Sequence, residues 1–126
     1  MGGWSAELLA SFAQEDEVRV APGDGNRRAS TIVWCVVAGG RVFLRAYRGP
    51  RSRWHRAALE HGRGQVRVRE RWIPVRFVPV AANDPVHAAI DAAYRAKYGG
   101  SPYLAPMLEP GPRHATVELV AEEGTT

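Results

Sequence analysis

The stretch at residues 30–38 is the sequence feature that most restricts what this chain can fold into. Residues 32–37 are all apolar, so a strand formed here must be covered on both faces. Gly39-Gly40 follows at once, and two glycines can adopt the positive φ angles that a tight hairpin turn needs. The chain then returns as a further strand over residues 41–45. We therefore expect a sheet of hairpin-connected strands with residues 30–38 as a central strand.

Other segments carry the signals of shorter strands. Residues 18–21 run into the turn-rich cluster 22–26, which predicts a wide hairpin with the central strand. A period-two alternation from Val66 to Phe77 predicts a hairpin that reverses around Glu70-Arg71. Pro74 cannot donate to a strand ladder, so it must face an edge or a bulge. A last strand is expected over residues 114–121.

Three helices are predicted from apolar spacing and capping residues. Trp4, Leu8 and Phe12 recur at helical spacing with Ser5 near the cap. Ser52 is placed to cap a helix that carries Trp54 and stops at Gly62. Residues 84–85 read as the cap and first position of a longer helix closed by residues 99–100, and the Pro-rich stretch 101–113 is expected to be irregular.

Together these elements predict one α+β domain over residues 1–126, with a core at about 4–121 and a disordered tail at 122–126. A chain of 126 residues lies at the commonest domain size. Short, mostly antiparallel strands with a crossover helix close well as a small β-barrel, which removes exposed edges. We expect six strands and two or three flanking helices.

The apolar content and the chain start exclude some classes of protein. The longest apolar run is far too short to span a bilayer, and the first residues lack the pattern of a secretory signal. A cytoplasmic protein without membrane contact is therefore expected. The lone Cys35 lies in an apolar strand and is interpreted as a small buried hydrophobe.

The positive charge is concentrated in one part of the chain. Residues 41–76 hold eleven Arg against only Glu60 and Glu70, whereas the rest of the chain is net acidic. Such an excess favours an anionic partner, either a phosphorylated small molecule or nucleic acid. A solvated strand face in an arginine-rich sequence explains the same pattern.

Two stretches, residues 34–54 and 89–103, resemble in residue type and spacing the bacterial family known as domain of unknown function 2255. More distantly, the order of strand, glycine turn, strand, polar loop and Trp-bearing helix resembles the deazaflavin-dependent nitroreductases and the pyridoxamine-phosphate-oxidase-like split barrels. This second resemblance implies a six-stranded FMN-binding-type split barrel that forms a homodimer. It also implies an FMN or deazaflavin site and a small oxidoreductase as the function.

The resemblance places the cofactor at the loop after the third strand and the start of the next helix. The positions implied to approach the phosphate are Tyr47, Arg48, Gly49, Arg51, Ser52 and Trp54, and the cofactor-binding segment as a whole is expected to run from Arg45 to Trp54. A helix N-terminus, a small residue, a hydroxyl and an Arg fork suit a phosphate. Trp34, Tyr47 and Trp54 are candidates to stack on the ring, and Lys97, Tyr98 and Tyr103 are candidates for a lid or substrate contact. The Gly-Arg-Lys-Ser-Gly hairpin of those relatives is replaced here by residues 23–30, where Arg27, Arg28 and Ser30 are the substitutes.

No side-chain motif for catalysis or metal binding stands out. The four His residues are scattered, and no Gly-x-Ser-x-Gly motif occurs, so neither a structural metal nor a hydrolytic triad is expected. His55 or His61 remains a candidate base. A redox cofactor would itself supply the difficult chemistry.

Two other functions remain open. A cationic hairpin would suit single-stranded nucleic acid, and its residues are Arg67, Arg69, Arg71 and Arg76, interleaved with Trp72. The aromatic residues on this hairpin are few, which argues against nucleic-acid binding. A dimer that binds a partner and carries no cofactor is the third reading.

Overall fold

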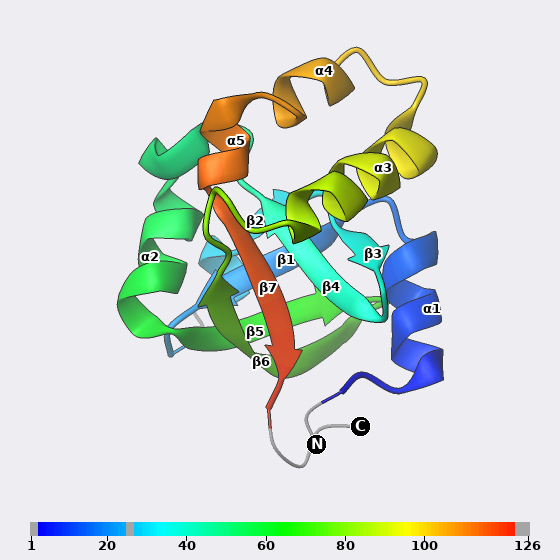
Figure 1. The fold of residues 1–126 in the computed structure, drawn as a ribbon. Coiled ribbons are helices and arrows are strands. Elements are labelled where there is room, and N and C mark those ends of the chain that lie inside the picture. The colour runs from blue at the N-terminus through cyan, green and yellow to red at the C-terminus, as the bar shows by residue number, and fades with distance from the viewer. Residues whose placement is uncertain (1–2, 25–26, 123–126) are drawn as a thin grey trace.

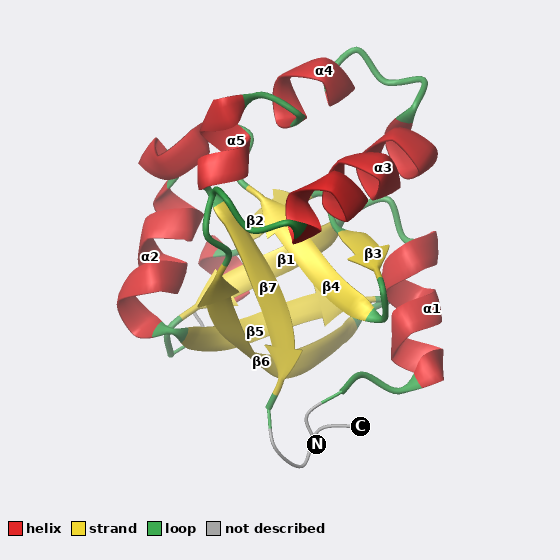
Figure 2. Ribbon diagram, viewed as in Figure 1, coloured by secondary structure: helices red, strands yellow, loops and turns green. Residues whose placement is uncertain are grey.

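The structure is a computed structural model, and it describes residues 3–24 and 27–122. A curled antiparallel sheet forms its centre, with helices along the top and both sides in Figures 1 and 2. The strand order is β2-β1-β5-β6-β7-β4-β3. The strands are β1 (Val18–Pro22), β2 (Thr31–Val33), β3 (Val36–Ala38), β4 (Arg41–Arg45), β5 (Arg63–Val68), β6 (Arg71–Pro79) and β7 (Thr116–Ala121).

The helices lie before and between these strands in the chain. The α-helices are α1 (Ala6–Gln14), α2 (Arg53–His61), α3 (Val86–Tyr98), α4 (Leu104–Met107) and α5 (Pro110–His114). Short 3-10 turns cover Arg27–Ala29 (η1) and Gly49–Arg51 (η2). The α+β class is therefore confirmed. The expectation of two or three helices was too low, because the Pro-rich stretch expected to be irregular forms α4 and α5.

The expectation of one central strand over residues 30–38 is wrong. Strand pairing stops at Trp34 and Cys35, which divides the stretch into two short strands. β2 pairs with β1, and β3 pairs with β4. These two short strands lie at opposite ends of the sheet order although only two residues join them. The chain must change pairing partner where the sheet curls, and this raises the strand count from the expected six to seven.

The hairpins follow their turn residues closely. Gly39 and Gly40 have positive φ angles of 59° and 74° and join β3 to β4 as expected. The β5–β6 reversal lies one residue earlier than predicted, with Arg69 and Glu70 in the left-handed region and Val68 opposite Arg71.

Pro74 lies in an inner strand of the sheet, not in an edge strand. Its carbonyl accepts a hydrogen bond from the Glu122 N–H, beyond Ala121, the last residue of β7. Its ring nitrogen points to that same side, where the β7 ladder ends. The missing donor thus falls just beyond the β6–β7 ladder, which begins at Val75 opposite Ala121, so Pro74 lies at the end of that ladder and not at the expected sheet edge or bulge.

The predicted caps are partly confirmed. The Ser5 hydroxyl accepts the Leu8 N–H at 3.2 Å, and Gly62 ends α2 with a φ of 72°. The Asp84 carboxylate accepts the Val86 N–H at 2.8 Å at the start of α3. Ser52 stands at the N-cap position of α2, but its side chain makes no capping bond.

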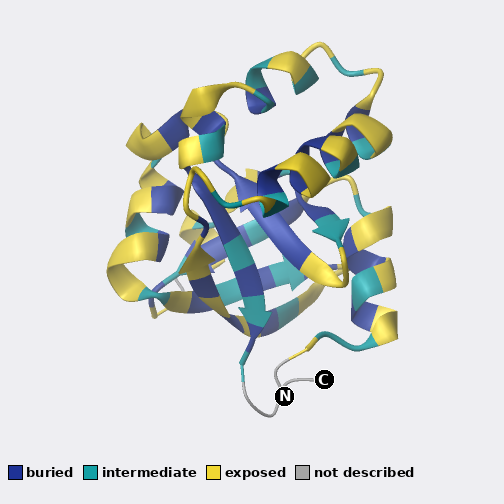
Figure 3. Ribbon diagram, viewed as in Figure 1, coloured by how far each residue is buried: buried dark blue, intermediate teal, exposed yellow. Residues whose placement is uncertain are grey.

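The buried side chains form two groups on either side of the sheet (Figure 3). The larger group fills the inside of the curl and includes Phe12 from α1, Trp54 from α2, and Val66 and Leu119 from the sheet. The smaller group lies between β3–β4 and α3, and Phe43 and Tyr94 belong to it.

Within the described part of the chain, no helix has both the length and the apolar character needed to cross a membrane. Of the segment expected as a disordered tail, residues 123–126 lie outside the described residues, as do residues 25–26 of the expected turn.

Candidate functional site

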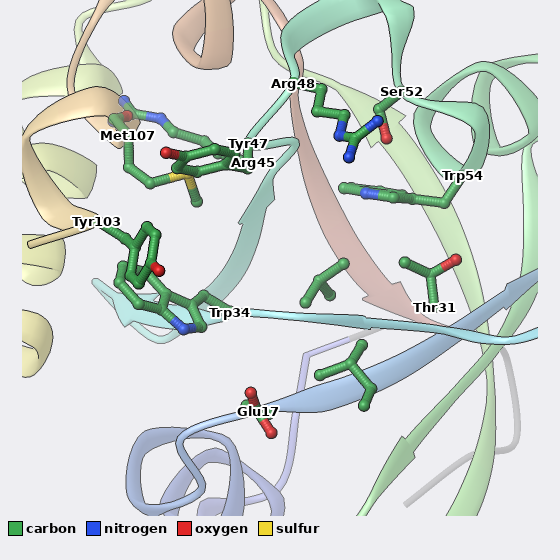
Figure 4. Close-up of a pocket in the computed structure, with 12 residues that line it drawn as sticks. Glu17, Thr31, Trp34, Arg45, Tyr47, Arg48, Ser52, Trp54, Tyr103 and Met107 are labelled. Carbon is green, nitrogen blue, oxygen red and sulfur yellow. The ribbon is translucent and has the colours of Figure 1, made fainter. Parts of the chain in front are cut away.

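A cleft of about 380 Å³ opens where the end of β4, the start of α2 and the kinked β2–β3 segment meet (Figure 4). Volumes of about 300–1,000 Å³ are usual for small-molecule sites. The lining is mostly apolar and contains a few polar side chains. The residues are Glu17, Thr31, Ile32, Val33, Trp34, Arg45, Tyr47, Arg48, Ser52, Trp54, Tyr103 and Met107.

The loop after β4 brings three polar or aromatic side chains to one side of the cleft. The Gly49 N–H donates to the Ala46 carbonyl at 2.9 Å, and Gly49 has a φ of 70°, so the chain turns sharply into η2 and α2. A Cβ on Gly49 would come within 3.3 Å of the Gly111 backbone in α5. Glycine is thus required at this turn, which carries Arg48, Ser52 and Trp54 to the cleft.

Two tryptophans face the cleft from opposite walls (Figure 4). Trp54 is almost fully buried and is anchored in the larger core group. The Trp34 ring stacks on Tyr98 with a centroid distance of 3.9 Å and an interplanar angle of 2°. At the rim, the half-exposed rings of Tyr47 and Tyr103 meet edge to face at 6.0 Å. The cleft therefore has apolar ring walls suited to a flat ligand.

Arg48 and Ser52 are two polar residues of the cleft whose side chains the protein does not use, and the side chains of Glu17 and Thr31 likewise form no hydrogen bond with a described residue. Neither the Arg48 nor the Ser52 side chain forms a hydrogen bond or ion pair with any residue that the structure describes, and Arg48 is exposed. Ser52 stands at the start of a nine-residue helix, where the first N–H groups lack helical partners. Together they offer a guanidinium, a hydroxyl and a helix N-terminus to an anionic group.

Arg45 lines the cleft, but its guanidinium is directed into the protein. It is 1% exposed, and it donates to the Asp91 carboxylate at 2.6 Å, the Met107 carbonyl at 3.2 Å and the Thr116 hydroxyl at 3.1 Å. A fourth N–H donates to His87 Nδ1 at 3.0 Å. Four of its five N–H groups are therefore engaged by protein, so the Arg45 guanidinium, expected among the cofactor-binding groups, is committed to the fold.

The lid residues expected near the end of α3 divide into two sets. Tyr103 lines the cleft, whereas Lys97 and Tyr98 lie behind Trp34, beside a second, more open hollow. Lys97 Nζ donates to the carbonyls of Phe12 at 2.9 Å and Cys35 at 2.7 Å. The Tyr98 hydroxyl donates to the Asp16 carbonyl at 2.7 Å and accepts the Cys35 N–H at 3.3 Å. These two side chains satisfy the backbone where β2 breaks from β3, and Tyr98 also supports the Trp34 ring.

Gly49 and Arg51 complete the predicted phosphate loop, and neither borders the cleft. Gly49 is buried against α5, and Arg51 is exposed on η2. The structure thus brings together Trp34, Arg45, Tyr47, Arg48, Ser52, Trp54 and Tyr103 from the predicted set.

Two titratable groups with a shifted pKa, Cys35 and His55, lie outside the cleft lining. Burial raises the pKa of the Cys35 thiol, and the nearby Lys97 ammonium offsets part of that rise. Burial lowers the pKa of His55, whose Nδ1 has no partner among the described residues. No group of three His, Cys, Asp or Glu side chains in the described segments is arranged to hold a metal ion.

Sequence reasoning missed several cleft residues, among them Glu17, Thr31 and Met107. Met107 belongs to the short helix α4 in the Pro-rich stretch, which carried no helix signal. It also missed the cluster of His87, Asp91 and Thr116 around Arg45, because these residues lie 42 to 71 positions away in the chain.

Residues 8–119 match the model of a family described as an uncharacterized protein conserved in bacteria (DUF2255). No curated protein matches the chain.

Proposed function

The chain belongs to this family of uncharacterized bacterial proteins, and we propose that its cleft binds a flavin or deazaflavin-type cofactor. In this proposal the ring lies between the walls formed by Trp34 and Trp54, and the phosphate meets Arg48 and Ser52 at the start of α2. The protein would then act as a small oxidoreductase.

The contrast between used and unused polar groups carries the proposal. The Arg45 guanidinium has four hydrogen bonds to protein, whereas the side chains of Arg48 and Ser52 have none among the described residues. An N-cap serine usually accepts a backbone N–H of the first helical turn, as Ser5 does in α1. A free hydroxyl and a free guanidinium beside the same helix start are the donors that an anionic group recruits.

The shape and composition of the cleft fit a planar ring. Its volume lies within the usual range for small-molecule sites, and its walls are largely aromatic and aliphatic. A flavin or deazaflavin would supply hydride or electron transfer. The residues of the chain need only hold the ring, orient it and limit the access of water, which is consistent with a cleft that contains no His or Cys among the residues described as its lining.

The sheet topology supports the more specific split-barrel class. β2 and β3 are joined by only Trp34 and Cys35 and lie at the two ends of the sheet order. If they are taken as one bent strand, six strands follow one another around a closed barrel. The exposed rim residues Ile32, Tyr47 and Tyr103 would then meet a second copy or the substrate, in a homodimer with the cleft near its interface.

Fluorescence titration tests the proposal directly. We expect FMN or a deazaflavin cofactor to quench tryptophan fluorescence saturably, with an affinity that changes little between low and high salt because ring burial is not screened. Arg48→Ala should weaken binding by about tenfold, the effect of losing one charge-assisted contact. Arg51→Ala removes an equal charge three residues away, outside the cleft, and should leave the affinity unchanged.

Other outcomes distinguish the alternatives. If neither cofactor quenches the fluorescence, the cofactor proposal is wrong and a partner-binding dimer without a cofactor becomes the better reading. Equal losses from Arg48→Ala and Arg51→Ala would move the phosphate site out of the cleft. Sedimentation velocity measures the homodimer separately, and a monomer at micromolar concentration would contradict that part of the proposal.

A further inference from the structure

The outer face of β1, β5 and β6 carries a group of arginines around one tryptophan, which we call the arginine face. On these strands the core residues alternate with side chains that point away from the curl, and in Figure 1 the helices lie on the other sides of the sheet. Arg27 of η1 joins the group from a neighbouring segment. Its members are Arg19, Arg27, Arg63, Arg67, Arg76 and Trp72.

Like charges stand directly opposite each other at two places on this face. Arg19 is the cross-strand partner of Arg67, and Arg63 is the partner of Arg76. Directly opposed like charges destabilise a sheet. Arg67 and Arg76 also form no hydrogen bond or ion pair with any of the residues described, so no direct contact offsets this repulsion at these two side chains.

Acidic groups lie beside both ends of the arginine face. Glu15, Glu17 and Glu70 surround a hollow beside Arg19 and Arg67, and Glu15 lies 3.7 Å from Arg69. Asp24 lies 3.5 Å from Arg63, but both side chains are well exposed, which makes this a weak pair. An anionic partner is thus favoured along the line from Arg67 across Trp72 to Arg76.

Trp72 gives the face a stacking surface. It lies directly opposite Arg67, and the Arg27 guanidinium sits 5.2 Å from the centre of its ring. Arg27 is held there by a 2.8 Å hydrogen bond from its Nε to the Gln65 amide oxygen. Bases of single strands stack on aromatic rings and guanidinium planes, while arginine forks take the phosphates.

We infer that the arginine face binds single-stranded nucleic acid, with a base at Trp72 and phosphates at Arg67, Arg76 and Arg63. A second copy docking by the same face would bring arginines against arginines, so it is disfavoured. An acidic polypeptide would pair with the charges but would have no base to place on Trp72. This site is separate from the cleft and does not depend on the proposed cofactor.

The test is the binding of a fluorescently labelled oligothymidine strand, followed by anisotropy at several salt concentrations. The intact protein should bind at low salt and weaken as salt rises, by a slope of about 0.7 for each phosphate contacted. The double variant Arg67→Gln with Arg76→Gln should bind at least tenfold more weakly and lower that slope by about 1.4, for two lost contacts. Trp72→Leu should lower the affinity with little change of slope, because it removes stacking and not charge.

The matched control is Arg56→Gln with Arg95→Gln, which removes the same charge from exposed positions on α2 and α3. It should retain the affinity and slope of the intact protein. Thermal melting provides a second readout. Because Arg67→Gln with Arg76→Gln removes the repulsion between opposed arginines, this variant should be at least as stable as the parent.

Three results would overturn the inference. They are no binding of the oligothymidine at low salt, equal losses in the face and control variants, and binding of polyglutamate as tight as that of the oligothymidine. The last result would identify the partner as an acidic polypeptide. Arg48→Ala should not change nucleic-acid binding, so this proposal and the cofactor proposal can fail separately.

Discussion

Arg45 and Arg48 lie three residues apart, yet they belong to two different regions of the molecule. Arg45 is the centre of a buried polar cluster, where its guanidinium contacts Asp91, His87 and Thr116. Arg48 points into the open cleft and has no partner among the described residues. Both are arginines of the same short segment, so residue type alone does not tell a structural arginine from one that is free to bind.

The difference follows from what surrounds each side chain. A buried charge is tolerated only when its partners replace the lost water, and the cluster does this for Arg45 with charge-assisted bonds. An exposed charge needs no such compensation, which leaves Arg48 available to a ligand. The cluster should therefore control stability, and the cleft should control binding.

Replacing each arginine by methionine gives the largest expected difference between Arg45 and Arg48. Arg45→Met leaves the buried Asp91 with only Arg113, at 2.9 Å, and should lower the free energy of unfolding by about 3–5 kcal/mol. Arg48→Met should change it by less than about 0.5 kcal/mol. Urea denaturation measures both changes in the free energy of unfolding. Equal effects of the two substitutions would contradict the assignment of Arg45 to stability and Arg48 to binding.

A second substitution tests how the cleft wall is held. Lys97→Met removes the donor that satisfies the carbonyls of Phe12 and Cys35 at the strand break and should cost about 1–3 kcal/mol of stability. Arg95→Met, on the same helix but exposed, is the control and should have little effect. A Lys97 variant as stable as the parent would mean that water replaces the ammonium at the break.

A pH series tests the surroundings of Arg45 through Tyr94, whose hydroxyl accepts the backbone N–H of Arg45 at 3.1 Å. Burial raises the pKa of this phenol above its ordinary value of 10.0. The unfolded chain ionises near that ordinary value while the folded chain stays protonated, so the contribution to stability is complete below about pH 10 and is lost as the pH rises. By pH 11 the loss should be about 1.4 kcal/mol. Tyr94→Phe should remove this part of the dependence in urea titrations, and an unchanged slope would contradict it.

The smallest expected effect compares two serines at helix starts. Ser5→Ala should lower stability by about 1 kcal/mol because it removes the cap of α1. Ser52→Ala should leave stability nearly unchanged, since Ser52 caps nothing in α2, and should instead weaken cofactor binding. Thermal melting measures the stability of both variants, and the fluorescence titration measures cofactor binding by the Ser52 variant. A stability loss at Ser52 as large as that at Ser5 would show that the hydroxyl serves the helix.

Local signals in the sequence predicted most of the elements and some of their ends. Gly39-Gly40, Gly62 and Ser5 act through φ angles and hydrogen bonds that span a few residues, so their effects can be read from the chain alone. The same holds for the alternation of β5 and β6 and for the turn that carries Arg48 and Ser52 toward Trp54. The family resemblance over residues 34–54 and 89–103 agrees with the match to residues 8–119.

Tertiary structure decided the features that depend on residues far apart in the chain. The break at Trp34 and Cys35 depends on the curl of the whole sheet and on Lys97 and Tyr98, which lie more than 60 residues away. The assignment of Arg45 to the interior depends on Asp91 and Thr116, and the pairing of arginines on the outer face depends on strand register. Sequence patterns report short-range preferences, whereas burial, pairing and charge compensation are set by residues that become neighbours only when the chain folds.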